Sequence, residues 1–301
     1  MTDDDWHALM LRIRDGRCTP FLGAGACVPA LPLGGDLAEE WADEYGYPMD
    51  DRRDLARVTQ FMAVRFKDQM FPKDRMRERI QDLPGPDFAR EDEPHAALAD
   101  LPLPVYITTN YDGFMVEALR DRKRVPAQEI CRWNTSPAVT AARGVLASKK
   151  FVPTPQNPVV FHLHGRLDIR ESMVLTENDY LDFLVATSRS KKSLLPHQME
   201  LALGGSSLLF IGYRLADWSF RVLHRGLVTN VAQSLQHGSV AVQIAPDPDP
   251  DTPEGRREAE AVREFLDRYF DQLDVRVFWG DANAFARELR RRWAIFNRGR
   301  D

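Results

Sequence analysis

Two histidines close together in the sequence are the side chains best suited to acid–base chemistry. His162 and His164 stand in the run His-Leu-His-Gly, and residues two apart on a strand point to the same side. Imidazole exchanges a proton near neutral pH, so either ring could serve as a general base. Gly165 allows the chain to turn directly after His164, which leaves that histidine at the end of the strand. We therefore expect His164 to be the base, with His162 as the alternative.

A second group of polar side chains ends another apolar run. Thr108-Thr109-Asn110-Tyr111-Asp112 follows Val105-Tyr106-Ile107. The amide of Asn110 both donates and accepts hydrogen bonds, which suits the orientation of a water molecule or a neutral leaving group. Asp112 is also well placed to cap a helix beginning near Gly113. The run therefore predicts either a polar site or a helix cap, and the cap is the more frequent arrangement for isolated residues of these types.

Small-residue turns follow two further apolar runs. Gly23-Ala24-Gly25-Ala26 comes after Pro20-Phe21-Leu22, and Gly212-Tyr213-Arg214 comes after Leu208-Leu209-Phe210-Ile211. Small residues let a backbone approach a phosphate closely, and free N–H groups can donate to it. The first turn has Val28 where a dinucleotide fingerprint has its third glycine, and it has no Gly-Lys-Ser/Thr ending. Each turn is compatible with a phosphate cradle or with an ordinary strand-to-helix turn.

The cysteines and histidines form no local metal motif. Cys18, Cys27 and Cys131 are far apart and never in a Cys-x-x-Cys pair, and His162 and His164 have no third ligand at a matching local spacing. This pattern argues against a zinc ribbon and against a disulfide scaffold. We expect a fold that needs no metal.

The four groups follow runs that are typical of buried parallel strands. Residues 105–108, 159–163, 208–211 and 240–244 are short, apolar and β-branched, and 275–279 alternates like an edge strand. Helical patterns lie at 4–16, 111–124, 177–203, 215–236, 254–271 and 281–296. Alternating strands and helices predict an α/β fold with a doubly wound, Rossmann-like parallel sheet. Ligands of such sheets bind beyond the carboxyl ends of the strands, where the four groups lie.

The composition is that of a folded globular chain. Its 301 residues include 40 Lys+Arg and 45 Asp+Glu, for a formal net charge of -5, and 44% are hydrophobic. That hydrophobic content is too high for a disordered chain, and the acidic balance argues against a general nucleic-acid binder. No apolar run approaches the roughly 18 residues that span a bilayer, and the acidic start is unlike a signal peptide. We expect a cytoplasmic protein without membrane or direct nucleic-acid contacts.

The order of the four groups resembles the sirtuin-like (silent information regulator-like) family. Residues 108–112 stand where sirtuin deacylases have Gln-Asn-x-Asp, 164–165 where they have the catalytic His-Gly, and 212–214 where a Gly-Thr-Ser turn holds the adenine-side ribose. The resemblance implies that NAD is the ligand and that Asn110 and His164 are catalytic. It also implies NAD contacts from Gly23, Ala24, Gly25, Ala26, Thr109, Asp112, Gly212, Tyr213 and Arg214.

The chain also departs from the sirtuin deacylases. It lacks their two Cys-x-x-Cys pairs, and residues 26–32 replace the serine and the Pro-x-Phe-Arg segment that follow their first turn. With residues 175–180, the four groups resemble instead the prokaryotic branch, whose members hydrolyse NAD in antiphage defence. This resemblance implies a NAD glycohydrolase that releases nicotinamide and ADP-ribose. The alternatives are a NAD-dependent deacylase or ADP-ribosyltransferase, and a non-catalytic nucleotide-binding sensor or scaffold.

A single sirtuin-like domain is expected over residues 1–301. Its Rossmann-like core is expected at about 1–35, 101–168 and 204–301, and an inserted helical module, with no zinc module, at about 36–100 and 169–203. The resemblance implies an activating partner such as a HerA-type ATPase. We also expect a homo-oligomer that forms through 36–100 or through the arginine-rich C-terminal helix, because arginine and aromatic side chains are enriched in interfaces.

Overall fold

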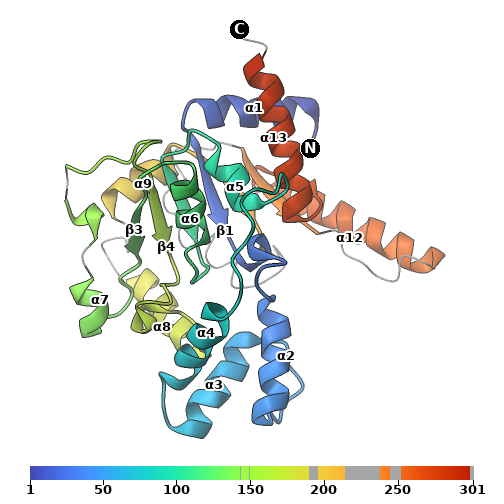
Figure 1. Ribbon diagram of the computed structural model, residues 1–301. Coiled ribbons are helices and arrows are strands. Elements are labelled where there is room, and N and C mark those ends of the chain that lie inside the picture. The colour runs from blue at the N-terminus through green and yellow to red at the C-terminus, as the bar shows by residue number, and fades with distance from the viewer. Residues whose placement is uncertain (143, 149, 190–195, 214–237, 245–251, 299–301) are drawn as a thin grey trace.

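The computed structural model describes the chain except residues 143, 149, 190–195, 214–237, 245–251 and 299–301 (Figure 1). Its centre is a seven-stranded sheet in which every neighbouring pair is parallel, in the order β3-β4-β2-β1-β5-β6-β7. The strands are β1 (Cys18–Leu22), β2 (Val105–Thr108), β3 (Ala127–Ile130), β4 (Val159–His162), β5 (Ser207–Ile211), β6 (Ser239–Gln243) and β7 (Val275–Trp279). The predicted doubly wound parallel sheet is confirmed, with β7 at one edge.

The sequence patterns missed the other edge strand, β3. Its sequence, Ala-Gln-Glu-Ile, is half polar and lacks the apolar run that marks a buried strand. Glu129 is nevertheless buried there, because its carboxylate accepts hydrogen bonds from the N–H groups of Ile130 and Leu146 and pairs with Arg132. A buried acid with such partners is stable, although composition alone argues against it.

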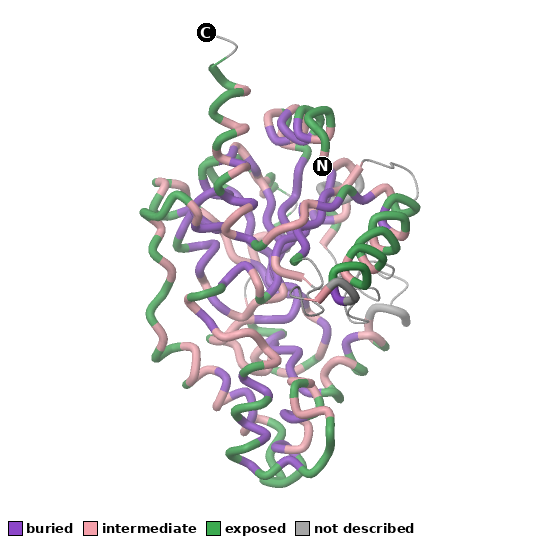
Figure 2. Tube along the Cα trace, turned by 90° about the vertical axis from the view of Figure 1, so that its right-hand side faces the viewer, coloured by how far each residue is buried: buried purple, intermediate pink, exposed green. Residues whose placement is uncertain are grey.

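Alternating strand residues feed two hydrophobic layers, one on each face of the sheet. On the first face, α1 (Asp3–Arg14), α5 (Pro94–Ala99), α6 (Phe114–Asp121) and α13 (Ala282–Arg298) pack on side chains such as Leu22, Tyr106 and Leu209. On the second face, α8 (Glu177–Arg189), α9 (His197–Gly204) and α12 (Pro253–Asp271) pack on Phe21 and Phe161. Figure 2 shows the strands buried between these layers, while most of α12 is exposed.

A group of three helices forms a separate small core below the sheet. It consists of α2 (Gly34–Tyr45), α3 (Leu55–Phe66) and α4 (Phe71–Gln81), which share buried side chains with Met173 and Leu175. Figure 1 shows these helices beyond the ends of the strands. The predicted helical module is smaller than expected, because α5 packs its Leu98 on the first face of the sheet and α8 and α9 pack on the second face. In this structure the helical module consists of α2, α3 and α4 with Met173 and Leu175.

The remaining elements are short. They are the 3-10 helices η1 (Ala24–Cys27), η2 (Val145–Ala147) and η3 (Arg170–Ser172) and the helix α7 (Pro137–Ala141). The helix expected at 215–236 lies outside the described residues, and the one expected at 177–203 is described as α8 and α9 on either side of 190–195. Among the described helices, none combines the length and the apolar character needed to cross a membrane.

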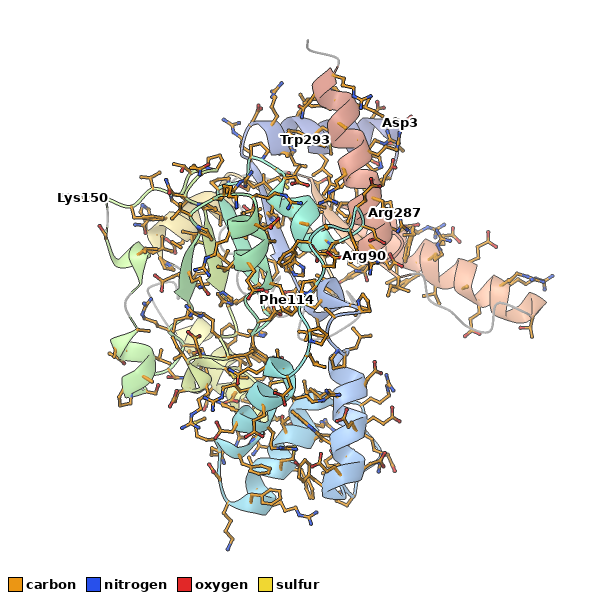
Figure 3. The ribbon with its side chains drawn as sticks, in the orientation of Figure 1. Asp3, Arg90, Phe114, Lys150, Arg287 and Trp293 are labelled. Carbon is orange, nitrogen blue, oxygen red and sulfur yellow. The ribbon has the colours of Figure 1, made fainter. Side chains whose placement is uncertain are left out.

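The arginines of the C-terminal helix are engaged within the chain. Arg287 pairs with Asp92, and Arg290 pairs with Asp100 and donates to the carbonyl of Arg90. Figure 3 shows Arg287 and Arg90 where α13 meets the segment before α5. These arginines therefore help to hold α13 to the segment around α5, and an interface through this helix stays a prediction.

The turn at Gly212 is a backbone constraint that can be tested. Its φ of +81° lies in the left-handed region, and a Cβ there would stand 2.3 Å from the backbone nitrogen of Ala26. Gly212→Ala should therefore lower the free energy of unfolding by more than about 2 kcal/mol in urea denaturation. Gly85→Ala is the matched control, because its added methyl only meets the Phe114 ring at 3.7 Å. Equal stability of the two variants would contradict this interpretation.

Candidate active site

The strand register brings the four predicted groups together at the carboxyl ends of neighbouring strands. Leu22, at the end of β1, pairs with Thr108 of β2 on one side and with Ile211 of β5 on the other. Thr108 in turn pairs with His162 at the end of β4. From β1 the chain continues to one side of the sheet through β2 and later to the other side through β5. Doubly wound sheets bind ligands at such a point, between the segments that follow the two central strands.

The two glycine turns at this edge pack against each other through their backbones. The N–H of Gly23 donates to the carbonyl of Ile211 at 2.9 Å, and the N–H of Gly25 donates to that of Gly212 at 3.0 Å. A Cβ on Gly25 would lie 2.9 Å from the Cα of Gly212. The glycines are thus needed for the contact between turns, a reason that the sequence interpretation did not include.

This contact bears on the predicted phosphate cradle at residues 23–26. Besides the two N–H groups that bond to the second turn, the N–H of Ala26 donates to the carbonyl of Gly23 at 3.0 Å. Three of the four predicted donors, those of Gly23, Gly25 and Ala26, therefore already have backbone partners in this structure. The phosphate cradle stays a prediction. Of the four residues, Ala24 is the one whose N–H has no backbone partner among the described residues and could donate to a phosphate.

Tyr213 and Thr109 join the ends of the three central strands. The Tyr213 hydroxyl lies 2.7 Å from Thr109 Oγ1 and donates to the carbonyl of Leu22 at 2.8 Å. Its ring packs against Phe21 and Phe210. These contacts give both residues a structural task at the predicted ribose side of the site. Arg214, the remaining member of that turn, lies outside the described residues.

Asn110 lies between the first glycine turn and β4. Its Nδ2 donates to the carbonyl of Gly23 at 3.0 Å and to Cys27 Sγ at 3.1 Å, while its own carbonyl lies 3.4 Å from His162 Nδ1. No described residue donates to its Oδ1. The side chain is therefore fixed by its amide nitrogen and presents an acceptor oxygen, which is what orientation of a water molecule requires.

The two histidines are both buried and both neutral. His164 packs edge-on against Tyr180 and Phe183, and the Nε2 atoms of His162 and His164 are buried without a hydrogen-bond partner in the described part of the chain. Burial lowers the pKa of each ring to about 3, with the charge of Arg166 adding to the effect at His162. A neutral imidazole can accept a proton, and a ligand that hydrogen-bonds to Nε2 would raise this pKa.

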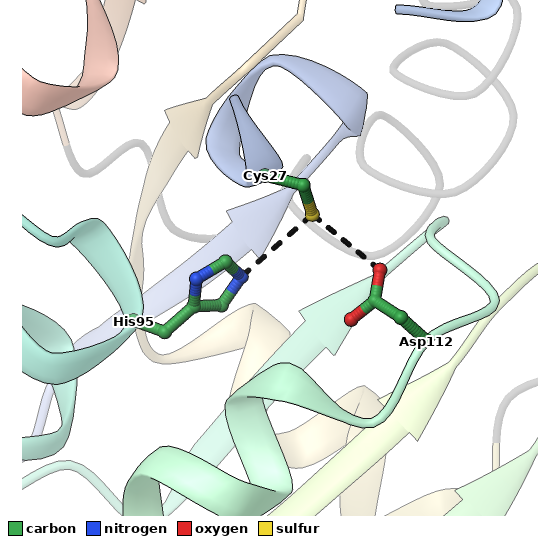
Figure 4. A group of neighbouring side chains, drawn as sticks. All are labelled: Cys27, His95 and Asp112. Carbon is green, nitrogen blue, oxygen red and sulfur yellow. Dashed lines mark hydrogen bonds between the residues drawn. The ribbon is translucent and has the colours of Figure 1, made fainter. Parts of the chain in front are cut away.

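Three residues that are far apart in the sequence, Cys27, His95 and Asp112, lie next to one another (Figure 4). The thiol of Cys27 donates to Asp112 Oδ2 at 3.4 Å, and its Sγ lies 4.0 Å from Nε2 of His95. His95 Nδ1 lies 2.7 Å from a carboxylate oxygen of Glu93. All four side chains are buried. They come from three separate segments, so no local spacing could have shown them.

The charges around this group keep the thiol protonated. Burial raises the pKa of Cys27 well above its usual value, and the nearby carboxylate of Asp112 raises it further. A buried neutral thiol is a poor nucleophile, so the contact with His95 does not form a reactive dyad. Asp112 has a second task, because its Oδ1 accepts the N–H of Phe114 at the start of α6. The N-cap itself is Gly113, which makes no side-chain cap hydrogen bond, so Asp112 supports the start of α6 from one residue before the cap position.

A comparison with protein families identifies the chain. The model described as "SIR2-like domain" matches residues 104–269, which is more than half of the sequence. The chain belongs to this family. The matched range contains Asn110, His164 and the Gly212 turn, whereas the first glycine turn and His95 precede it.

Curated relatives give the family match a chemical context. The chain is 26% identical over 162 residues to "NAD(+) hydrolase ThsA" of Acinetobacter baumannii (strain 532279), which is 53% of this chain and 30% of that protein. It is 25% identical over 184 residues to "NAD(+) hydrolase ThsA" of Bacillus cereus (strain MSX-D12), which is 60% of this chain and 33% of that protein. The match thus spans about a third of the length of these relatives.

A solved structure is also similar over nearly the whole chain. It is described as "Structural Basis for the Mechanism and Regulation of Sir2 Enzymes", and it aligns with 98% of this chain and 99% of its own at 10% identity and a TM-score of 0.40. A likeness at this score carries no argument about function.

The buried histidines predict a loss of stability in acid. Each has a folded-state pKa of about 3, whereas unfolding restores the ordinary value of 6.5, so the unfolded chain binds more protons as pH falls through this window. The linked effect is about 1.4 kcal/mol per pH unit for each ring. Between about pH 7 and about pH 5, the free energy of unfolding of His162→Gln should therefore fall by about 2 kcal/mol less than that of the parent chain.

Urea unfolding at the two pH values measures this difference. His197→Gln is the control, because that ring is exposed, and it should keep the pH dependence of the parent chain. The same dependence in His162→Gln would show that burial does not suppress protonation of this ring.

Proposed function

We propose that this protein is a NAD glycohydrolase that cleaves the bond between nicotinamide and ribose. The observation that carries the proposal is the position of Asn110, which lies between the first glycine turn and the histidine strand with its Oδ1 free of described donors. Membership of the SIR2-like domain family and the relatives named NAD(+) hydrolase support it.

The reaction needs little acid catalysis at the leaving group. Nicotinamide leaves as a neutral molecule, because the electrons of the broken C1′–N bond cancel the positive charge on its ring nitrogen. The ribose passes through an oxocarbenium-like state, as in other glycoside cleavage. Water then forms the new C1′–O bond and gives up a proton, and the products are nicotinamide and ADP-ribose.

Each predicted site residue has a place in this scheme. Asn110 Oδ1 accepts a hydrogen bond from the attacking water, and His164 accepts a proton from that water or from a ribose hydroxyl. Asp112 binds the nicotinamide carboxamide, for which one of its oxygens would exchange the Cys27 thiol for the substrate amide. The turn at 23–26 approaches the diphosphate, and Thr109 with the turn at 212–214 lies at the adenine-side ribose.

Activity of this kind requires control, because a cell that loses its NAD stops growing. We propose a homo-oligomer, an activating partner such as a HerA-type ATPase, and a role in antiphage defence in the cytoplasm. The helical module is the better contact surface, because Val64 and Phe66 of α3 and the nearby Met49 are exposed. Arg287 and Arg290 of α13 are already paired within the chain.

Product analysis tests the proposed reaction. The protein is incubated with NAD, with and without an acetylated peptide and the product of a neighbouring gene, and nicotinamide, ADP-ribose and deacetylated peptide are followed. We expect equal amounts of nicotinamide and ADP-ribose that do not depend on the peptide. Cleavage only with peptide would show a deacylase or transferase, and binding of NAD without cleavage would show a sensor or scaffold.

The role of His164 predicts a large loss of rate on its replacement. Loss of a general base typically lowers turnover by about 10²–10⁴-fold, so His164→Ala should cleave NAD at no more than about 1% of the parent rate. His197→Ala is the control, since that histidine is 77% exposed in its side chain and lies on α9, away from the strand ends. Circular dichroism establishes that both variants fold. Near-normal turnover by folded His164→Ala would transfer the role to His162.

A further inference from the structure

The atoms of Cys27, His95 and Asp112 have the spacing of a metal site. One ligand atom from each residue lies within 4.8 Å of the other two, and Sγ is 3.4 Å from Asp112 Oδ2 and 4.0 Å from His95 Nε2. Tetrahedral zinc, with bonds of about 2.0–2.3 Å, places such atoms about 3.4–3.6 Å apart. The Sγ–Nε2 distance is thus about half an ångström longer than in a zinc site, and the distance from Nε2 to the Asp112 carboxylate, which is at most 4.8 Å, has to close to the same range when a metal binds.

The orientation of His95 is fixed from behind by Glu93. A carboxylate can only accept, so the 2.7 Å contact between Glu93 Oε1 and His95 Nδ1 puts the ring proton on Nδ1. The lone pair of Nε2 then faces Cys27. Ligating histidines in zinc sites are held by a carboxylate in the same way, and this partner also increases the basicity of the ligand. Glu93 is itself held by α5, because its other oxygen accepts the N–H of Ala96.

Charge and surroundings favour a cation at this place. Within the described part of the chain, neither Asp112 nor Glu93 pairs with a lysine or an arginine, although both carboxylates are buried. Leu31 and Phe114 pack directly against Cys27 and keep the group in an apolar shell. Buried carboxylates in such a shell are stabilised by a positive charge. A divalent cation held by Cys27, His95 and Asp112 would supply it.

We propose that Cys27, His95 and Asp112 bind Zn²⁺, with the fourth position open to water or another small ligand. A thiolate and an imidazole select zinc over the hard cations Mg²⁺ and Ca²⁺, which take oxygen ligands. Binding forms a Zn–S bond and releases the Cys27 thiol proton to solvent. The site differs from a zinc ribbon because its ligands come from η1, α5 and the segment after β2.

Zinc at this place would also control the reaction, an inference that rests on the proposed function. The carboxylate of Asp112 cannot ligate zinc and bind the nicotinamide carboxamide through the same oxygen. Asn110 is affected as well, because its Nδ2 donates to Cys27 Sγ at 3.1 Å. Bound zinc therefore acts as a reversible inhibitor of NAD cleavage, and a chelator restores the rate.

Cobalt substitution tests the site without any activity measurement. The full chain is stripped with a chelator and titrated with Co²⁺, whose bond to a thiolate gives a charge-transfer absorption in the near ultraviolet. We expect one equivalent of Co²⁺ with this absorption, displaced by Zn²⁺. Cys27→Ser should lose the absorption. Cys131→Ser is the matched control, since that cysteine is equally buried but lies outside the metal-binding group, and it should retain the absorption.

Two further variants keep the test informative if Cys27→Ser folds poorly. His95→Gln should weaken Zn²⁺ binding strongly, and Glu93→Gln should weaken it about 10–100-fold, because its amide oxygen still orients the ring without the carboxylate charge. Competition with a chromophoric chelator measures both affinities. No charge-transfer absorption in the parent chain, or the same absorption in Cys27→Ser and Cys131→Ser, would overturn the zinc site.

A second arm separates the zinc site from the proposed function. NAD cleavage is followed for the stripped and the zinc-loaded chain, and we expect a loss of rate with zinc that a chelator reverses. A positive cobalt titration with unchanged NAD cleavage would overturn the inhibition and leave the site standing. A positive cobalt titration with no NAD cleavage by the stripped chain under any condition, including with its activating partner, would overturn the proposed function alone.

Discussion

The contact between two glycine turns is the constraint on which the rest of the site depends. The turns after β1 and β5 lie so close that any side chain at Gly25 or Gly212 would overlap backbone atoms of the other turn. Their mutual hydrogen bonds fix the carbonyl of Gly23, which in turn holds the amide of Asn110. A shift of either turn would therefore move the Gly23 carbonyl and the Asn110 side chain together.

Within this frame, the site is a set of buried polar groups with incomplete pairing. The Nε2 atoms of His162 and His164 are buried and have no hydrogen-bond partner among the described residues. Unpaired polar atoms in an apolar setting are costly, so a ligand that satisfies them is bound the more tightly. The same low-polarity setting explains why a thiol, an imidazole and two carboxylates beside Asn110 favour a metal ion.

The helical module is joined to the strand ends by specific contacts. The Tyr111 hydroxyl donates to the carbonyl of Val174 at 2.6 Å, and Met173 and Leu175 share the core of α2, α3 and α4. A buried pair between Lys73 of α4 and Asp179 of α8 adds a polar link at 2.9 Å. These contacts join the module to the segments after β2 and β4, which carry the predicted catalytic residues Asn110 and His164.

The sequence by itself determined the architecture and the order of the site. Short apolar runs predicted β1, β2, β4, β5 and β6, and an alternating run predicted β7. They missed β3, because periodicity reports burial, and β3 buries a glutamate that composition places outside. The motifs after the strands predicted which side chains lie at the carboxyl edge, because strands of a parallel sheet end on the same side. Those inferences depend on local pattern and on topology rules that hold for every doubly wound sheet.

Only the tertiary structure decided which distant residues meet. Cys27, His95 and Asp112 come from segments up to 85 positions apart, and no spacing rule connects them. Two further contacts also join distant parts of the sequence. The first turn needs its glycines because the backbone at Gly212 lies so close, and Arg290 holds α13 to the segment before α5. Pairings of this kind arise from packing between elements, and packing depends on the whole set of side chains at once, which a local pattern does not contain.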